Sequence, residues 1–372
     1  MAHAERPDID LESNSDWQRP IPLELPSVEG WKSKPIAESG EPLVPLGPFS
    51  GNEHARILTD SLYAGERENS PYPAQELDGS LLGVYVRRGV AERLELAERR
   101  LPSGLHLVVW DGYRTLELQQ SLYEYYRGNL AGQHPDWDGD ALDEETQRYV
   151  SLPSNDPEKP SPHNTGGSVD VDIISVPEMV EQRINEIDVA VANFGEDTSR
   201  WPEVYRLASE RTALLAKHST PLEFGADRDH GGPMSALNHF ELLAQERPLT
   251  DAESEARHNR RLLYNAMRHA GFEPFQSEYW HYNARESQMG AMTAGLSVAE
   301  YGAATFSTDC EGYEGTRRGH LTGTTKLSEG RAPISKVEGS HLRAVRAGVL
   351  TSGHPRETTL PVAEKIAPPK AA

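Results

Sequence analysis

The stretch SPHNTGGSVDVDI, residues 161–173, joins a turn to a strand and decides how the chain folds around it. Proline, asparagine and two glycines surround His163, which is typical of a turn that presents a side chain at a cleft. Polar and apolar residues then alternate, which predicts a strand over 168–174 whose even positions share one face. Asp170 and Asp172 lie on that face. The alternation alone leaves open whether the face is a metal site or an exposed polar sheet surface.

Helical and strand patterns on both sides of this stretch follow one another irregularly. LHLVVW at 105–110 predicts a buried strand, and Thr115 is a candidate N-cap for the helix that follows. FEPFQSEYWHY at 272–282 predicts a final strand or the end of one. Because helices and strands do not alternate regularly, the pattern favours an α+β fold over a doubly wound sheet. The predicted helices span residues 82–101, 115–128, 178–194, 202–217 and 258–270.

Composition and charge disfavour several classes of protein. The 372 residues carry 37 Lys and Arg against 58 Asp and Glu, a net charge of −21 without a basic patch, so neither nucleic acid nor an anionic membrane is expected as a partner. The sequence contains no apolar run that predicts a membrane span, and its N-terminus lacks the apolar core of a signal peptide. A single cysteine excludes a disulfide framework and a cysteine-rich zinc site. These features predict a cytoplasmic protein.

EYWH, residues 278–281, places a carboxylate three positions before an imidazole and among aromatic residues. An apolar environment suits a carboxylate that works as a general base near neutral pH. With His163 and an aspartate of the predicted strand, His281 would complete a His/Asp/His set that leaves the fourth position of tetrahedral zinc open for water. Glu278 would accept the proton of that water. The alternative is an aromatic core strand whose glutamate points to solvent.

WDGYR, residues 110–114, ends the predicted buried strand and opens the next helix. Side chains at such a junction can reach a cleft. The guanidinium of Arg114 could therefore stabilise the oxyanion that forms when hydroxide attacks a carbonyl. The alternative is that Arg114 is a surface residue, as arginines at helix starts usually are.

Together, the three stretches resemble the VanX-type D-alanyl-D-alanine dipeptidases. SPHNTGGSVD is similar to the family pattern S-x-H-x-x-G-x-A-x-D, with Ser168 in place of alanine. EYWH is similar to the family's E-x-W-H, and WDGYR to its D-x-Y-R element. The three motifs also follow one another in the family's order. The resemblance covers roughly residues 50–285.

The resemblance implies the zinc D,D-peptidase fold, which is a small antiparallel sheet flanked by helices. It implies one zinc ion per chain, held by His163, Asp170 and His281. It also implies that Glu278 is the general base and acid. The choice of Asp170 over Asp172 as the ligand comes from the resemblance, because the alternation of the strand allows both.

Further roles are carried over from the family to matching positions. The resemblance implies that Arg114 stabilises the transition state and that Ser161 helps to hold the amino end of the substrate. Tyr113, in the D-x-Y-R element, is predicted to bind substrate as well. LEFGADRD at the positions before residue 230 looks like the family's F-G-x-x-x-D region. Asp229 is therefore the candidate partner of the substrate ammonium, with Asp227 as the alternative.

The chain is longer than the family pattern, and we expect the additions to frame a catalytic domain over residues 51–285. Residues 1–50 are predicted to form an extended N-terminal arm. The two helices within 178–217 are predicted to be an insertion. Residues 286–349 are expected to form an irregular extension that packs on the domain, and 350–372 a flexible tail. The additions could build a lid, a dimer contact or a remodelled pocket.

The predicted activity is zinc-dependent hydrolysis of a small D-amino-acid-containing dipeptide such as D-alanyl-D-alanine by metal-activated water. The alternatives keep the zinc centre and change the substrate: an amidase of a biosynthetic pathway, or a D,D- or L,D-carboxypeptidase of cell-wall peptides. A non-catalytic protein with a structural metal is disfavoured, because structural zinc usually has four protein ligands. The expected partner is a small peptide or amide, and a homodimer is possible.

Overall fold

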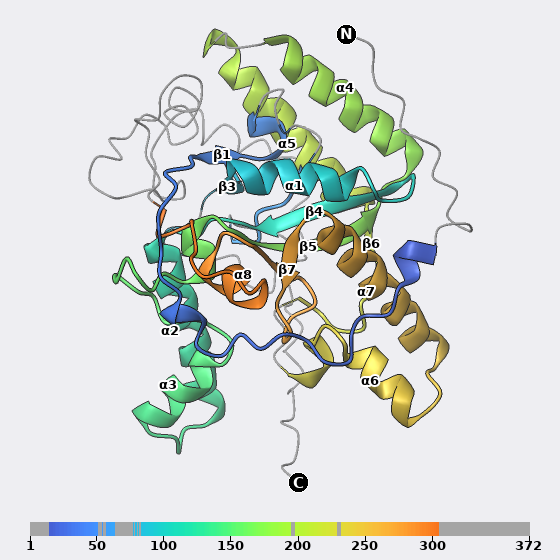
Figure 1. The fold of residues 1–372 in the computed structure, drawn as a ribbon. Coiled ribbons are helices and arrows are strands. Elements are labelled where there is room, and N and C mark those ends of the chain that lie inside the picture. Colours follow the sequence, from blue (N-terminus) through green and yellow to red (C-terminus); the bar gives the residue numbers. More distant parts are fainter. Residues whose placement is uncertain are drawn as a thin grey trace.

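The computed structural model describes residues 15–50, 54, 57–63, 77, 79, 81, 83–194, 198–228 and 232–304. Helices surround a small central sheet, which confirms the predicted α+β class (Figure 1). Within the described residues the sheet has six strands, in the order β2-β4-β5-β8-β7 with β6 paired to β5. These strands are β2 (Leu58–Thr59), β4 (Leu105–Asp111), β5 (Ser168–Ser175), β6 (Thr220–Pro221), β7 (Phe272–Pro274) and β8 (His281–Ala284).

Most neighbouring strands of the sheet run antiparallel, as expected. β5 pairs antiparallel with β4, β6 and β8, and β8 pairs antiparallel with β7. The exception is β2, which pairs parallel with β4 at one edge. Residues 272–282 differ from the single strand that the sequence predicts, because they form β7, a loop at 275–280 and the start of β8. This hairpin turns EYWH back toward β5.

The alternation of β5 divides its side chains between two buried faces. Val169, Val171 and Ile173 enter the main apolar core, which α1 (Arg88–Glu98) and α7 (Asp251–His269) also build. The even positions, including both aspartates, are buried as well. The alternative of an exposed polar sheet face is therefore wrong, because the side chains on this face of β5 are buried.

A second apolar cluster covers the face of β4 and β5 that points away from the main core. Leu118 and Leu122 of α2 pack in it with Ile184 of α4 and Leu215 of α5. Thr115 is the N-cap of α2, and its side chain accepts a hydrogen bond from the Leu118 N–H, as the sequence predicts. The helices of this cluster are α2 (Leu116–Gln133), α4 (Glu178–Phe194) and α5 (Trp201–His218), and α3 (Gly139–Gln147) packs on α2.

The helix predicted from residue 82 begins later than expected, at Arg88. Residues Tyr85–Arg87 instead form β3, which pairs antiparallel with β1 (Leu43–Pro45). Of the apolar residues that suggested one continuous helix, Val86 lies on this strand and Val90, Leu94 and Ala97 lie on α1. The two remaining helices of the described chain are α6 (His239–Glu246) and α8 (Gln288–Thr293).

The N-terminal segment runs across the molecule from α7 and α6 toward α2 and α8, seen as the blue trace in Figure 1. Side chains of the folded domain hold it at intervals. Asn265 donates to the Trp17 carbonyl (3.1 Å), Asn238 to that of Leu23 (2.7 Å) and Gln288 to that of Lys34 (2.7 Å). The path is that of an extended arm, although the division into domains stays a prediction. Residues 305–372, with most of the predicted extension and tail, lie outside the described residues.

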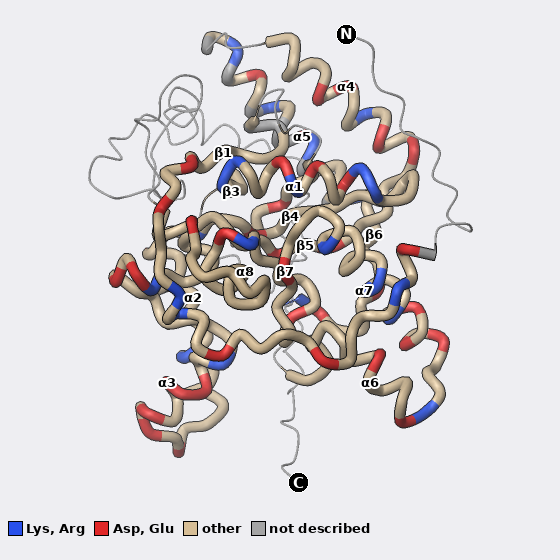
Figure 2. Tube along the Cα trace, in the orientation of Figure 1, with Lys and Arg blue, Asp and Glu red and all other residues tan. Residues whose placement is uncertain are grey.

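Charged residues of both signs are interspersed along the described helices, as Figure 2 shows. Across the described part of the chain, none of the helices combines the length and hydropathy that a membrane crossing needs. Cytoplasmic location and the expected partners stay predictions.

Candidate metal centre

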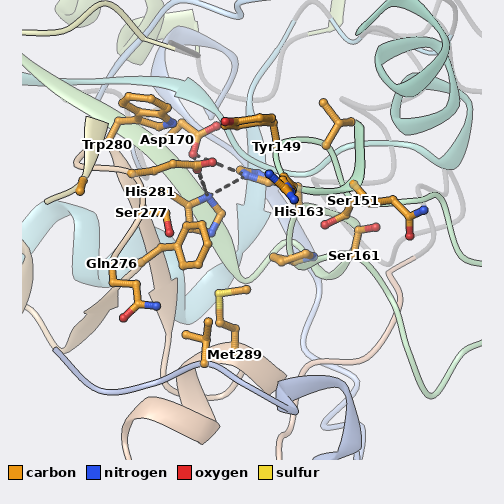
Figure 3. A pocket seen from close by; sticks show the side chains of 18 of the residues that line it. Tyr149, Ser151, Ser161, His163, Asp170, Gln276, Ser277, Trp280, His281 and Met289 are labelled. Atoms are coloured by element: carbon orange, nitrogen blue, oxygen red, sulfur yellow. Dashed lines mark hydrogen bonds and ion pairs between the residues drawn. The ribbon is translucent and has the colours of Figure 1, made fainter. Parts of the chain in front are cut away.

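Three side chains converge where β5 meets β8. His163 lies in a 3-10 turn (Pro162–Thr165), Asp170 lies on β5, and His281 opens β8 directly opposite Asp170 in the strand register. His163 Nε2 lies 3.2 Å from His281 Nδ1, and Asp170 Oδ1 lies 3.0 Å from the same Nδ1 (Figure 3). The three buried groups offer one donor atom each, all within 4.8 Å of one another. They form a set that could hold a metal ion.

Hydrogen bonding determines which nitrogen of His163 faces the centre. Its Nδ1 lies 2.8 Å from the Gly112 carbonyl, which can only accept, so the proton is on Nδ1. The Asp111 carboxylate, 3.6 Å away, favours the same tautomer. The Nε2 lone pair of His163 therefore points toward Asp170 and His281, as a metal ligand requires.

The tautomer of His281 is set from the other side of its ring. His281 Nε2 lies 3.1 Å from the Asn283 Oδ1, which therefore accepts its proton. The Ser168 hydroxyl donates to the same oxygen at 2.7 Å, and the Asn283 amide nitrogen lies 3.4 Å from Met289 Sδ. These contacts hold the amide in place. His281 Nδ1 is left without a proton and faces the centre.

The donor set fits a divalent zinc-type cation. Two imidazole lone pairs and a carboxylate oxygen face one another in a buried site, and such lone pairs repel unless a cation lies between them. Two nitrogen ligands and one carboxylate are a set found in open zinc sites. Burial alone would raise the pKa of Asp170, but the neighbouring His163 and His281 outweigh it and lower that pKa. A metal ion would bind the anionic form of this carboxylate.

Arg114 follows β4 and lies beside the centre. Its guanidinium pairs with Asp111 and lies 3.3 Å from Asp170 Oδ2, so the two oxygens of Asp170 face different groups. The ring of Tyr63 lies under the guanidinium, with 5.3 Å from Cζ to the centroid. Arg114 also lines the cavity described below. This position places a positive charge next to the three donors.

Glu278 lies in the β7–β8 loop at the edge of the centre. Its Oε2 is 3.9 Å from His281 Nδ1, and its side chain is 22% exposed. The loop is fixed by backbone bonds, in which Tyr279 N–H donates to Ser235 and Val171 N–H to the Trp280 carbonyl. The role of Glu278 as general base stays a prediction.

The remaining predicted substrate residues have different positions. Ser161 is buried and lines the cavity, with its hydroxyl 3.4 Å from the Leu152 carbonyl. Tyr113 is buried and its hydroxyl donates to the Ala304 carbonyl at 3.1 Å; it is not among the described residues that line the cavity. Asp227 is exposed, and Asp229 lies outside the described residues. The substrate roles of these residues stay predictions.

A cavity of about 740 Å³ opens onto the three donors. Polar and apolar side chains both line it. Figure 3 shows Ser277 beside His281, with Gln276 and Met289 farther from the three donors. The wall includes Leu23, Leu25, Val28 and Trp31 from the N-terminal arm, Tyr126 and Tyr149 near α2 and α3, and Phe275 and Trp280 from the β7–β8 hairpin.

Two features of the site were not predicted from the sequence. Asn283 was missed although it stands two positions after His281, so strand periodicity would have placed both on one face. The contribution of Leu23 and Trp31 to the cavity has no local signal, because the arm reaches the site only through contacts with distant parts of the chain.

No protein-family model matches the chain. The chain is 23% identical over 264 residues to the D-alanyl-D-alanine dipeptidase of Synechocystis sp., a match that covers 67% of this chain and 84% of that protein. This relative confirms the resemblance to the D-alanyl-D-alanine dipeptidases. The match extends well beyond the three short motifs, over most of the relative's length. By its name, that relative cleaves a dipeptide.

Proposed function

We propose that the protein is a zinc-dependent dipeptidase that hydrolyses small D-amino-acid-containing dipeptides of the D-alanyl-D-alanine type. The observation that carries the proposal is the convergence of His163, Asp170 and His281 at an open cavity, with Glu278 at its edge. Three protein ligands leave a position for water, as catalytic zinc sites do. The dipeptidase name of the relative supports the choice of reaction and substrate.

Glu278 and Arg114 have different roles in the proposed amide hydrolysis. When bound, zinc supplies a Lewis acid that polarises a carbonyl and acidifies water. The Glu278 carboxylate accepts a proton from the attacking water and then donates it to the leaving amine. Arg114 provides positive charge for the oxyanion, and its contact with Asp170 Oδ2 keeps it beside the reacting group.

The test is release of D-alanine from D-alanyl-D-alanine by the zinc-loaded protein. Glu278→Gln should retain one zinc per chain, because Glu278 is not one of the three donors, and should lower kcat by at least about 100-fold. Glu124→Gln, an exposed glutamate on α2 outside the lining of the cavity, is the matched control and should leave kcat unchanged.

Near wild-type turnover by Glu278→Gln would contradict its role as base. Failure of the zinc-loaded wild type to hydrolyse any D,D-dipeptide would contradict the proposed substrate class. Assays of L,D- and L,L-dipeptides and of simple amides would then show whether the centre belongs to a carboxypeptidase or an amidase.

A further inference from the structure

The N-terminal arm forms one wall of the cavity, through a segment that we call the strap, residues 23–31. Leu23, Leu25, Val28 and Trp31 all line the cavity that opens onto the metal centre. Each of these side chains is apolar. The sequence places the strap about 130 or more positions before the first metal ligand, so its arrival at the cavity is a property of the fold.

Hydrogen bonds hold the strap at both ends. At its start, the Leu23 carbonyl accepts from the largely buried Asn238 at 2.7 Å. Just beyond its end, the Lys34 carbonyl accepts from the buried Gln288 at 2.7 Å, and Lys34 Nζ donates to the Leu296 carbonyl at 2.5 Å. Because groups from α8 and from the residue before α6 fix these positions, the strap presents its side chains in a defined place.

The apolar side chains of the strap are only partly covered. Leu23 is 46% exposed, and Leu25, Val28 and Trp31 are half-buried. Met289 of α8 points into the same cavity in Figure 3. Apolar surface that lines a cavity and is left partly open is typical of a site that covers it with the ligand.

The cavity is also large for the smallest D,D-dipeptide. Cavities of about 300–1,000 Å³ enclose most of a drug-sized molecule. The 740 Å³ found here is of that size, whereas both side chains of D-alanyl-D-alanine are methyl groups. A dialanine would therefore fill only part of this cavity.

We propose that the strap selects dipeptides in which at least one residue carries a bulky apolar side chain, such as leucine, in preference to D-alanyl-D-alanine. The proposal rests on the proposed function and names its substrate class. The selected side chain lies against Leu23, Val28 and Trp31 and removes their surface from water. Met289 and Phe275 provide further apolar contact.

The test compares kcat/KM of the zinc-loaded enzyme for D-Ala-D-Ala, D-Ala-D-Leu and D-Leu-D-Ala. At least one leucine-containing dipeptide should be preferred over D-Ala-D-Ala by about tenfold or more, the discrimination that added methylene groups give in an apolar pocket. A preference for D-Ala-D-Ala over both would overturn the inference while leaving the proposed function intact. If no dipeptide is hydrolysed, the proposed function fails and this inference fails with it.

Variants of the strap test whether it is the source of the preference. Leu23→Asn and Val28→Asn should reduce the ratio of kcat/KM for the preferred leucine dipeptide to that for D-Ala-D-Ala by several-fold. Leu96→Asn on α1 is the matched control: Leu96 is also 46% exposed but is not among the described lining residues. It should leave the ratio unchanged. An unchanged ratio in both strap variants would overturn the inference.

Discussion

Two aspartates on one face of β5 have opposite environments. Asp170 faces two imidazoles, and Asp172, two positions along, faces the Arg228 guanidinium at 2.5 Å. Arg228 in turn stacks over Trp110, with 3.7 Å from Cζ to the ring centroid. The two regions, a metal centre around Asp170 and an ion pair around Asp172, lie side by side on a strand. The strand register distinguishes them, because Asp170 lies opposite His281 of β8 and Asp111 of β4, whereas Asp172 lies opposite Val108 of β4.

The pKa directions of the two carboxyl groups follow from these surroundings. Burial would raise both, and at Asp170 the two histidines reverse the effect and lower the pKa. At Asp172 burial dominates, Arg228 opposes it, and the charge of Asp170 adds to it, so that pKa is raised. The same residue type on the same face thus serves as a ligand at one position and as a structural partner at the next.

The largest expected effect concerns zinc affinity at Asp170. Asp170→Asn should weaken zinc binding by more than about 100-fold, because the loss of a ligand exceeds the roughly 10–100-fold that loss of an outer partner costs. Asp172→Asn should change the affinity only a few-fold. Competition with a chelator measures both. Equal losses in the two variants would contradict the division of β5 into two regions.

The Asp172–Arg228 ion pair should contribute to the stability of the fold. Asp172→Ala removes a buried carboxylate that pairs with the mostly buried Arg228, and we expect the free energy of unfolding of the metal-free protein to fall by about 3–5 kcal/mol. Glu144→Ala, which removes one partner of an exposed ion pair with Arg148, is the control and should cost less than about 1 kcal/mol. Urea unfolding measures both. A loss at Asp172 no larger than the control would show that the pair is not structural.

A smaller effect is expected where His281 is positioned. Asn283→Leu removes the acceptor of the His281 Nε2 proton and should weaken zinc binding by about 10–100-fold, whereas Asn283→Asp keeps an acceptor and should restore much of the affinity. Nitrogen NMR shifts of the imidazole report the tautomer directly in the metal-free protein. An unchanged tautomer in Asn283→Leu would show that Asn283 does not set it.

Ser168 should have the smallest effect of the series. Ser168→Ala removes only one donor to Asn283 and leaves the His281 contact, so we expect a few-fold change in zinc affinity. A loss equal to that of Asn283→Leu would place the control of His281 at Ser168 instead.

The sequence predicted the parts of the site that depend on local pattern. The two faces of β5, the N-cap at Thr115 and the order of the three motifs can all be derived from short stretches. Asp170 could not be chosen over Asp172 from alternation, since both share a face; the structure groups Asp170 with His163 and His281. That separation depends on strand partners more than 60 positions away along the chain.

Other features of the molecule depend on long-range pairing and were missed for that reason. Tyr85–Arg87 became a strand because Leu43–Pro45 pairs with it, against the helical pattern of its own neighbourhood. The hairpin at 272–284 and the strap at the cavity likewise need partners that no local window contains.

The most direct test of the account is a crystal structure of the zinc-soaked protein with data collected at the zinc absorption edge. The account predicts one strong anomalous peak per chain, about 2.0–2.2 Å from His163 Nε2, His281 Nδ1 and an Asp170 oxygen. Asp172 should remain paired with Arg228. A peak on Asp172, on the opposite nitrogen of either histidine, or none at these residues would contradict it.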